Sequence, residues 1–212
     1  MLSAAEASLP RKYLFSIAVE MLRLRGRQMS MTFFCIVSVH PSLPPHVPTP
    51  LKTLADMVLL GDPRLYETCA PVTESDLPLV PGWVADLHNV MQEVRAKYHF
   101  GRGIAAPQLG VMKRLVYLHL NGRPVVLLNP ELTDVSPELF ELWDDCMCFP
   151  NLLVRVQRHV SLTVAYRDGH WQPQRWTVQG ALSELIQHEY DHLNGVLCTM
   201  RALDAQAFRW RP

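Results

Sequence analysis

Apolar residues recur at helical intervals in two stretches of the chain, Trp83–His99 and Gly180–Leu193. Side chains three or four positions apart lie on one face of an α-helix, so each stretch can bury one apolar face. These apolar positions are Val84, Leu87, Val90, Met91, Val94 and Tyr98 in the first stretch, and Leu182, Leu185, Ile186 and Leu193 in the second. We predict two amphipathic helices, the second of which ends where Gly195 adopts a left-handed conformation.

Between the two helices, shorter apolar runs alternate with turn residues. Asn121-Gly122 and Asp168-Gly169 are turn signals, and each separates two runs rich in residues that favour strands. A glycine-rich loop, Gly101–Gly110, precedes these runs. The expected strands are Leu115–Leu120, Pro124–Leu128, Leu139–Trp143, Val160–Tyr166 and Arg175–Val178. Strands that cluster in hairpins favour an α+β fold, with antiparallel β-sheets around a central C-terminal helix.

Residues 1–50 are expected to form an extension outside the folded domain, which we expect to span residues 51–212, with regular structure from near Leu54. Apolar residues in the segment Lys12–Arg27 are interleaved with arginines, and half of residues 41–50 are prolines. This composition is typical of an amphipathic transit peptide followed by an extended linker. We therefore expect a mitochondrial or plastid location. An untargeted cytoplasmic extension, a later initiator methionine and a secretory signal are the alternatives.

The overall composition narrows the functional classes. Of the 212 residues, 49% are hydrophobic and 19% are charged, as in ordinary globular domains. Twenty basic and twenty acidic side chains give a net charge of zero, so no direct nucleic-acid binding is predicted. The five cysteines form no CxxC pair, which favours a reducing compartment over a disulfide framework. No apolar run reaches the roughly eighteen residues that a membrane span needs.

The second predicted helix carries an HExxH motif at residues 188–192. Residues four apart lie on one helical face, so His188 and His192 can reach one ion, and Glu189 can approach water there. A catalytic site normally takes three protein ligands, yet no histidine or glutamate follows His192. The third ligand must therefore come from upstream. Cys146 is the candidate and Cys148 is its rival; on a strand the two would point to opposite faces.

A thiolate and two neutral imidazoles leave a divalent ion with about one net positive charge, which is enough to acidify a water molecule. Such soft ligands do not by themselves discriminate among iron, zinc and nickel. An HExxH motif is also compatible with a zinc metallopeptidase. That class, however, gives no reason for Cys146 or for the loop that carries Gln108.

Three segments in order resemble the motifs of peptide deformylases. Residues 101–108 are similar to Gly-x-Gly-apolar-Ala-Ala-x-Gln, residues 144–148 to Glu-Gly-Cys-Leu/Met-Ser, and residues 187–195 to the family's HExxH segment. The resemblance covers residues 54–203 and implies a hydrolase that removes the formyl group from N-formylmethionine and releases formate. Its substrates would be nascent peptides leaving the ribosome, in protein biosynthesis and N-terminal methionine processing. It also implies Fe²⁺ as the native ion, with Zn²⁺ or Ni²⁺ as substitutes.

The residues support that chemistry independently. Glu189 is expected to take a proton from the attacking water and pass it to the departing amine. The developing oxyanion needs two donors, for which the Gln108 side-chain amide and the backbone N–H of Met147 are the candidates. Gln108 could equally be a loop residue that holds backbone in place. The sequence makes no prediction of the oligomeric state.

The chain departs from the family pattern around the expected substrate pocket. Asp144, Asp145 and Cys148 replace the usual Glu, Gly and Ser, and Arg102 and Glu184 stand at usually apolar positions. The expected substrate-binding residues are Gly101, Arg102, Gly103, Ile104, Asp145, Glu184 and Leu185. We hypothesise a more polar or more open pocket, with altered side-chain preference or lower activity, in which Arg102 and Glu184 either pair or are solvated. A catalytically weak, metal-binding paralogue is the rival.

Overall fold

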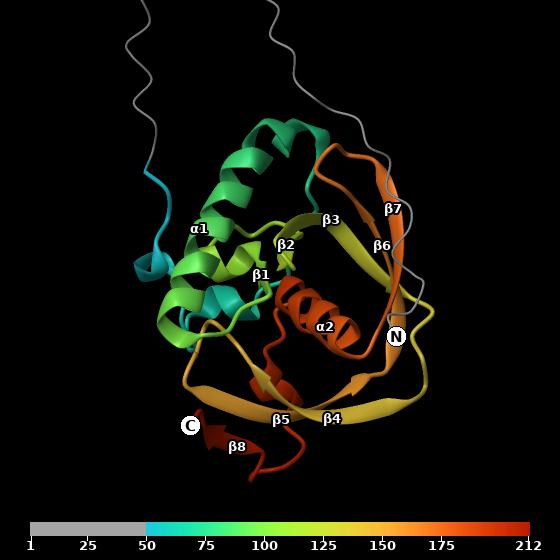
Figure 1. Ribbon diagram of the computed structural model, residues 1–212. Helices are drawn as coiled ribbons and strands as arrows, with labels where there is room; N and C mark the ends of the chain where they lie inside the picture. The colour runs from blue at the N-terminus through green and yellow to red at the C-terminus, as the bar shows by residue number, and fades with distance from the viewer. Residues whose placement is uncertain (1–49) are drawn as a thin grey trace, which may run out of the picture. The chain divides into compact units, whose positions relative to one another are not determined.

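The computed structural model describes residues 50–212, so the extension predicted for residues 1–50 lies, apart from Pro50, outside the described part of the chain. The described part contains the two predicted α-helices, α1 (Val80–Tyr98) and α2 (Ala181–Leu193), and two antiparallel β-sheets (Figure 1). The predicted α+β fold with antiparallel sheets is thereby confirmed. No helix among residues 50–212 is long and apolar enough to cross a membrane.

The first sheet has five strands and the second has three. In spatial order, the first contains β1 (Gly103–Ala105), β2 (Leu115–Leu120), β3 (Arg123–Thr133), β6 (Ser161–Arg167) and β7 (Pro173–Gln179). The second contains β4 (Leu139–Asp145), β5 (Leu152–His159) and β8 (Phe208–Trp210). Five short 3₁₀ helices connect these elements: Leu54–Asp56, Pro63–Tyr66, Glu74–Leu79, Ala106–Leu109 and Cys198–Arg201.

The β2–β3 hairpin forms as its turn sequence predicts. Leu120 pairs with Arg123, and the two residues between them, Asn121 and Gly122, have φ of 49° and 78°. Two successive left-handed residues match the right-handed twist of the flanking strands, which is why Asn-Gly is favoured there. Strand β3 continues past the predicted end at Leu128, through an irregularity in its pairing with β6.

Several elements differ from the sequence prediction, and strand β8 was not predicted. Helix α1 begins at Val80 rather than Trp83, because Pro81 is tolerated in the first turn of a helix. The glycine-rich loop contains the short strand β1, followed by a 3₁₀ helix. Strand β5 was not predicted, because its core-facing residues include the buried Arg158, which interrupts the apolar alternation.

Helix α2 lies between the two sheets (Figure 1), in contact with β1, β2 and β7 on one side and with β5 on the other. Its anchor to β5 is Gln187, which accepts from the N–H of His159 at 3.0 Å and donates to its carbonyl at 2.9 Å. Gly195 follows the helix with φ of 69°, and a Cβ there would lie 2.5 Å from the carbonyl oxygen of Tyr66. Only glycine meets both conditions, so the helix ends there as predicted.

Candidate metal centre and substrate cleft

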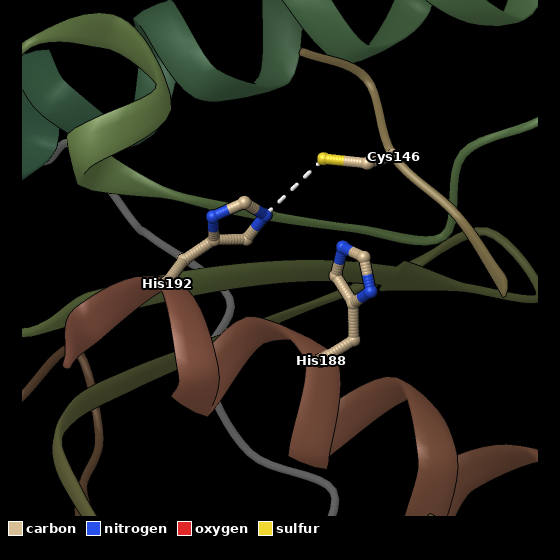
Figure 2. A group of neighbouring side chains, drawn as sticks. All are labelled: Cys146, His188 and His192. Carbon is tan, nitrogen blue, oxygen red and sulfur yellow. Dashed lines mark hydrogen bonds between the residues drawn. The ribbon is translucent and has the colours of Figure 1, made fainter. Parts of the chain in front are cut away.

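Cys146, His188 and His192 converge on one buried point (Figure 2). One ligand atom from each of the three lies within 4.8 Å of the others, and the Cys146 Sγ is 3.3 Å from the His192 Nε2. The two imidazoles project from one face of α2, as their four-residue spacing predicts, and the cysteine approaches from the segment after β4. The geometry therefore brings together the three predicted ligands.

Cys148 does not join this group, although it is also buried. Strand β4 ends at Asp145 and residues 146–149 form a turn, in which Phe149 N–H donates to the Cys146 carbonyl at 3.2 Å. Cys146 and Cys148 therefore lie in a turn rather than on a strand, so the expectation that they point to opposite faces does not hold. The side-chain amide of Gln108 lies near both sulfurs, 3.7 Å from Cys146 and 3.5 Å from Cys148.

A buried carboxylate orients the first histidine. Asp144 Oδ1 lies 2.9 Å from His188 Nδ1, which leaves the other ring nitrogen for the ligand cluster. Arg158 of β5, with only 2% of its side chain exposed, bridges Asp144 at 2.9 Å and Asp191 of α2 at 2.6 Å. Arg201 pairs with Asp191 from the other side. Sequence reasoning missed this network, since a charged residue in a strand carries no signal that it will be buried.

Asp144, His188 and Cys198 form a second group whose ligand atoms lie within 4.8 Å of one another. This group shares His188 with the first, and its carboxylate is already paired with Arg158. Burial raises the pKa of the Cys198 thiol well above its ordinary value. The first group is therefore the better candidate for a metal, with Asp144 as the partner of His188.

The electrostatics of Cys146 and His192 suit a cation. Burial raises the pKa of the Cys146 thiol well above its ordinary value and lowers the pKa of His192 well below its own. Neutral His192 is the form that ligates a metal, whereas a buried thiolate needs a positive charge beside it. A divalent ion among these atoms would supply that charge, so the donor set fits a metal that favours sulfur and nitrogen.

Glu189 lies beside this cluster and is 3% exposed. Among the described residues, its Oε2 is a buried atom with no hydrogen-bond partner. Burial raises its pKa to about 7, with the nearby His188 acting in the opposite direction. The close approach of β1 requires Gly103, because a Cβ there would lie 2.8 Å from the Glu189 Oε1. A buried carboxyl that titrates near neutrality is suited to exchange protons with substrate.

Gln108 holds loop backbone, as one of its two predicted roles requires, while its role as an oxyanion donor stays a prediction. Its Oε1 accepts from the N–H of Ala105 at 2.8 Å, which ties the loop backbone, while its amide nitrogen is directed at the sulfur of Cys146. Met147 lies nearby, and no protein acceptor among the described residues takes its N–H. Gln108 and Met147 therefore offer two donors next to the ligand cluster.

A cavity of about 690 Å³ opens onto this site. Its lining includes Gln108, Met147, His188 and Glu189, together with six of the seven predicted substrate-binding residues: Gly101, Arg102, Gly103, Asp145, Glu184 and Leu185. The seventh, Ile104, lies elsewhere. It is fully buried in the apolar core, because neighbouring residues on strand β1 point to opposite sides. The expectation that Ile104 lines the pocket is therefore corrected.

Two ion pairs have at least one residue in the wall of this cavity. Arg102 pairs with Glu184 and also donates to the carbonyl of Ala181 at 3.0 Å. Of the two alternatives for Arg102 and Glu184, pairing or solvation, the structure therefore shows pairing. Asp145 pairs with Arg211 at 2.6 Å. Burial raises the pKa of Glu184, and Arg102 acts against that shift. The polar character predicted for this pocket is thus present in its walls.

Arg95 and His119 are lining residues that sequence reasoning did not find. The guanidinium of Arg95 donates to the carbonyls of Gly101 at 2.7 Å and His119 at 2.8 Å. It therefore holds the glycine-rich loop next to the end of β2. No local pattern marks this contact, because Arg95 and His119 lie 24 positions apart on different elements.

Comparisons with known proteins agree with this geometry. The sequence model of the family described as polypeptide deformylase matches residues 54–207. The peptide deformylase of Thermotoga maritima is 31% identical over 149 residues, which are 70% of this chain and 87% of that protein. A Prochlorococcus marinus peptide deformylase is 36% identical over 153 residues, 69% of this chain and 72% of that protein.

Solved structures give the same result. A peptide deformylase from Synechococcus elongatus, crystallised with actinonin, has a TM-score of 0.66 and 32% identity, over 75% of this chain and 86% of that chain. The enzyme from Thermotoga maritima has a TM-score of 0.62 and 29% identity, over 70% of this chain and 97% of that chain. The resemblance seen in the three motifs is confirmed over most of the described residues. The chain belongs to the peptide deformylase family.

Proposed function

We propose that Cys146, His188 and His192 hold one divalent metal ion in this chain and that Glu189 transfers protons beside it. The observation that carries this proposal is the buried Glu189 carboxyl, with an unpartnered oxygen, next to three converging ligands. Peptide deformylases remove the N-formyl group from nascent proteins, and this chain, as a member of the family, has that activity. The family match decides against the zinc metallopeptidase alternative.

Each residue has a distinct task in formyl removal. When bound, the metal supplies Lewis acidity, which polarises a carbonyl and lowers the pKa of water. The substrate's formyl oxygen gains negative charge as the carbonyl carbon is attacked, and the Gln108 amide and Met147 N–H donate to it. Glu189 accepts a proton from the attacking water and then gives it to the departing amine, which releases formate.

The shift in the pKa of Glu189 serves these two steps. Burial raises the pKa of Glu189 above that of an ordinary carboxyl, which makes it a better proton acceptor. Asp144 keeps His188 oriented without entering the reaction, because its two oxygens are already taken by His188 and Arg158. Because the ligand cluster is buried away from water, charge interactions within it are stronger than they would be in solvent.

The test is metal content and formate release measured on the same samples of the wild type and Glu189→Ala. We expect Glu189→Ala to keep the metal and lose turnover by about two orders of magnitude or more. Glu141→Ala, on the exposed side of β4, is the control and should match the wild type. Loss of metal from Glu189→Ala, or its turnover at the wild-type rate, would contradict the assignment.

The charged cavity wall bears on the level of activity and on which first side chain of the substrate is preferred. The Arg102–Glu184 pair places two charges in the cavity wall, which favours a first side chain with some polarity over a wholly apolar one. Comparing kcat/KM for formylmethionyl and formylnorleucyl peptides tests this preference. A ratio equal to that of an ordinary deformylase would contradict it, and no turnover by the metal-loaded protein would favour the weak paralogue.

Two further expectations join the proposal. We infer that iron is the native ion, which parallel loading with Fe²⁺, Zn²⁺ and Ni²⁺ followed by turnover measurements would test. We also infer an organellar location, supported by the basic, proline-ended composition of residues 1–50. Fusion of residues 1–50 to a fluorescent protein tests it, and a diffuse cytosolic signal would count against it.

A further inference from the structure

The C-terminal residues contact the wall of the cavity without lining it: Arg211 reaches the lining residues Asp145 and Phe100. Strand β8 adds to the free edge of β5, with Trp210 paired to Leu152. The chain stays attached beyond the strand, since Arg211 N–H donates to the carbonyl of Asn151 at 2.7 Å and its Nε to that of Pro150 at 3.0 Å. Arg211 is thus fixed by its backbone and its side chain to the turn that follows the candidate ligand Cys146.

The guanidinium of Arg211 contacts two residues of the cavity wall. Its Nη2 lies 2.6 Å from the Asp145 Oδ2, and its Cζ lies 4.1 Å from the centre of the Phe100 ring. Asp145 belongs to the segment of Cys146, while Phe100 belongs to the loop that leads into Gly101 and Gly103. The Arg211 side chain therefore joins two segments of the cavity wall that lie far apart in the chain, one at Phe100 and one at Asp145.

The loop is held from its other side as well. Arg95 donates to the Gly101 carbonyl, and Arg102 reaches α2 through Glu184 and the Ala181 carbonyl. These contacts fix the start of the loop to α1 and to α2, while Gln108 near its end reaches the segment of Cys146, with its amide nitrogen 3.7 Å from the Cys146 sulfur. The link to that segment through Arg211 also neutralises the Asp145 carboxylate, which would otherwise face a substrate chain with an unpaired charge.

We propose, on the basis of the function proposed above, that Arg211 is a positioning residue that sets the width and charge of the cleft where the peptide binds. It holds Asp145 against Phe100 and so keeps the wall of the cleft in its binding shape. Arg211 touches neither the ligand cluster nor Glu189, so it acts on substrate binding rather than on proton transfer. Its effect should appear in KM and not in kcat.

The experiment uses the full, metal-loaded chain and a formylmethionyl tripeptide. Arg211→Ala should raise KM about tenfold, the size of one charge-assisted hydrogen bond, with kcat and metal content unchanged. Arg211→Lys, which keeps the charge near Asp145, should recover part of that loss. Arg209→Ala is the matched control: Arg209 lies two residues earlier, on β8, and its guanidinium stacks on Trp143, which does not line the cavity, so KM should be unchanged.

We call the contacts of Arg211 with Asp145 and Phe100 the clamp. A double-mutant cycle with Asp145→Asn separates the effect of the clamp on substrate binding from a general loss of stability. If the clamp acts through Asp145, Arg211→Ala should have a smaller effect in the Asp145→Asn background than in the wild type. An equal effect in both backgrounds, or an equal rise in KM for Arg209→Ala, would overturn the proposal. A fall in kcat without a change in KM would overturn it too.

A direct measurement of peptide binding distinguishes failure of the Arg211 proposal from failure of the proposed deformylase function. The tripeptide is titrated calorimetrically into metal-loaded Glu189→Ala, with and without Arg211→Ala. A weaker Kd on loss of Arg211 supports the clamp whether or not the wild type turns over. Turnover by the wild type with a Kd that does not depend on Arg211 overturns the clamp alone, and absence of both binding and turnover overturns both proposals.

Discussion

Replacing Arg158 with methionine tests whether the buried charge network supports both the fold and the metal site. The arginine side chain is 2% exposed and pairs with two buried carboxylates, Asp144 at 2.9 Å and Asp191 at 2.6 Å. Methionine keeps much of its volume but leaves both carboxylates without this partner. Burial opposes the ionisation of Asp144, yet His188 and Arg158 together hold its pKa well below the ordinary value.

Breaking one side of a buried pair typically costs about 3–5 kcal/mol of unfolding free energy. Asp191 retains Arg201 at 2.5 and 2.6 Å, so the loss falls mainly on Asp144, and we expect the lower end, about 3 kcal/mol. For a domain of this size that lowers Tm by about 6–12 °C. Because Asp144 orients His188, metal affinity should also fall, by about 10–100-fold.

The assay is urea unfolding of the metal-free protein, followed by metal titration of the folded protein. Arg155→Met is the control on the same strand, since its pair with Asp204 is 37% and 49% exposed and should contribute less than about 1 kcal/mol. Equal stabilities of Arg158→Met and Arg155→Met would refute the reasoning about the network. Unchanged metal affinity in Arg158→Met would refute the link from Asp144 to His188.

Three further predictions concern the site itself. Cys146→Ser should abolish stoichiometric metal binding while Cys148→Ser preserves it, because only Cys146 joins the ligand cluster; the opposite result in metal analysis would make Cys148 the ligand. Gln108→Ala should lower kcat about 10²–10³-fold with metal retained, as for loss of one oxyanion donor, and an unchanged kcat would remove it from that role. Gly103→Ala should lower formate release with metal retained, because the new Cβ would lie 2.8 Å from the Glu189 Oε1; wild-type kinetics would show that this carboxyl can shift freely.

Local sequence determined the secondary structure wherever a single period or turn signal dominated. The helix that became α2 was predicted from its apolar face and from Gly195, and the β2–β3 hairpin from Asn121-Gly122. These features depend on residues a few positions apart, so neighbouring residues suffice to specify them. Strand β5 escaped prediction because the burial of Arg158 depends on Asp144 and Asp191, 14 and 33 positions away.

The same division holds for the site. The sequence by itself determined that two imidazoles and a carboxylate share one helix, since their spacing fixes the face on which they lie. Only the tertiary structure decided that Cys146 rather than Cys148 meets His192, 46 positions on, and that Ile104 turns into the core. It alone joined Asp145 to Arg211, 66 positions away. Such contacts follow from strand register and sheet packing, which no local pattern encodes.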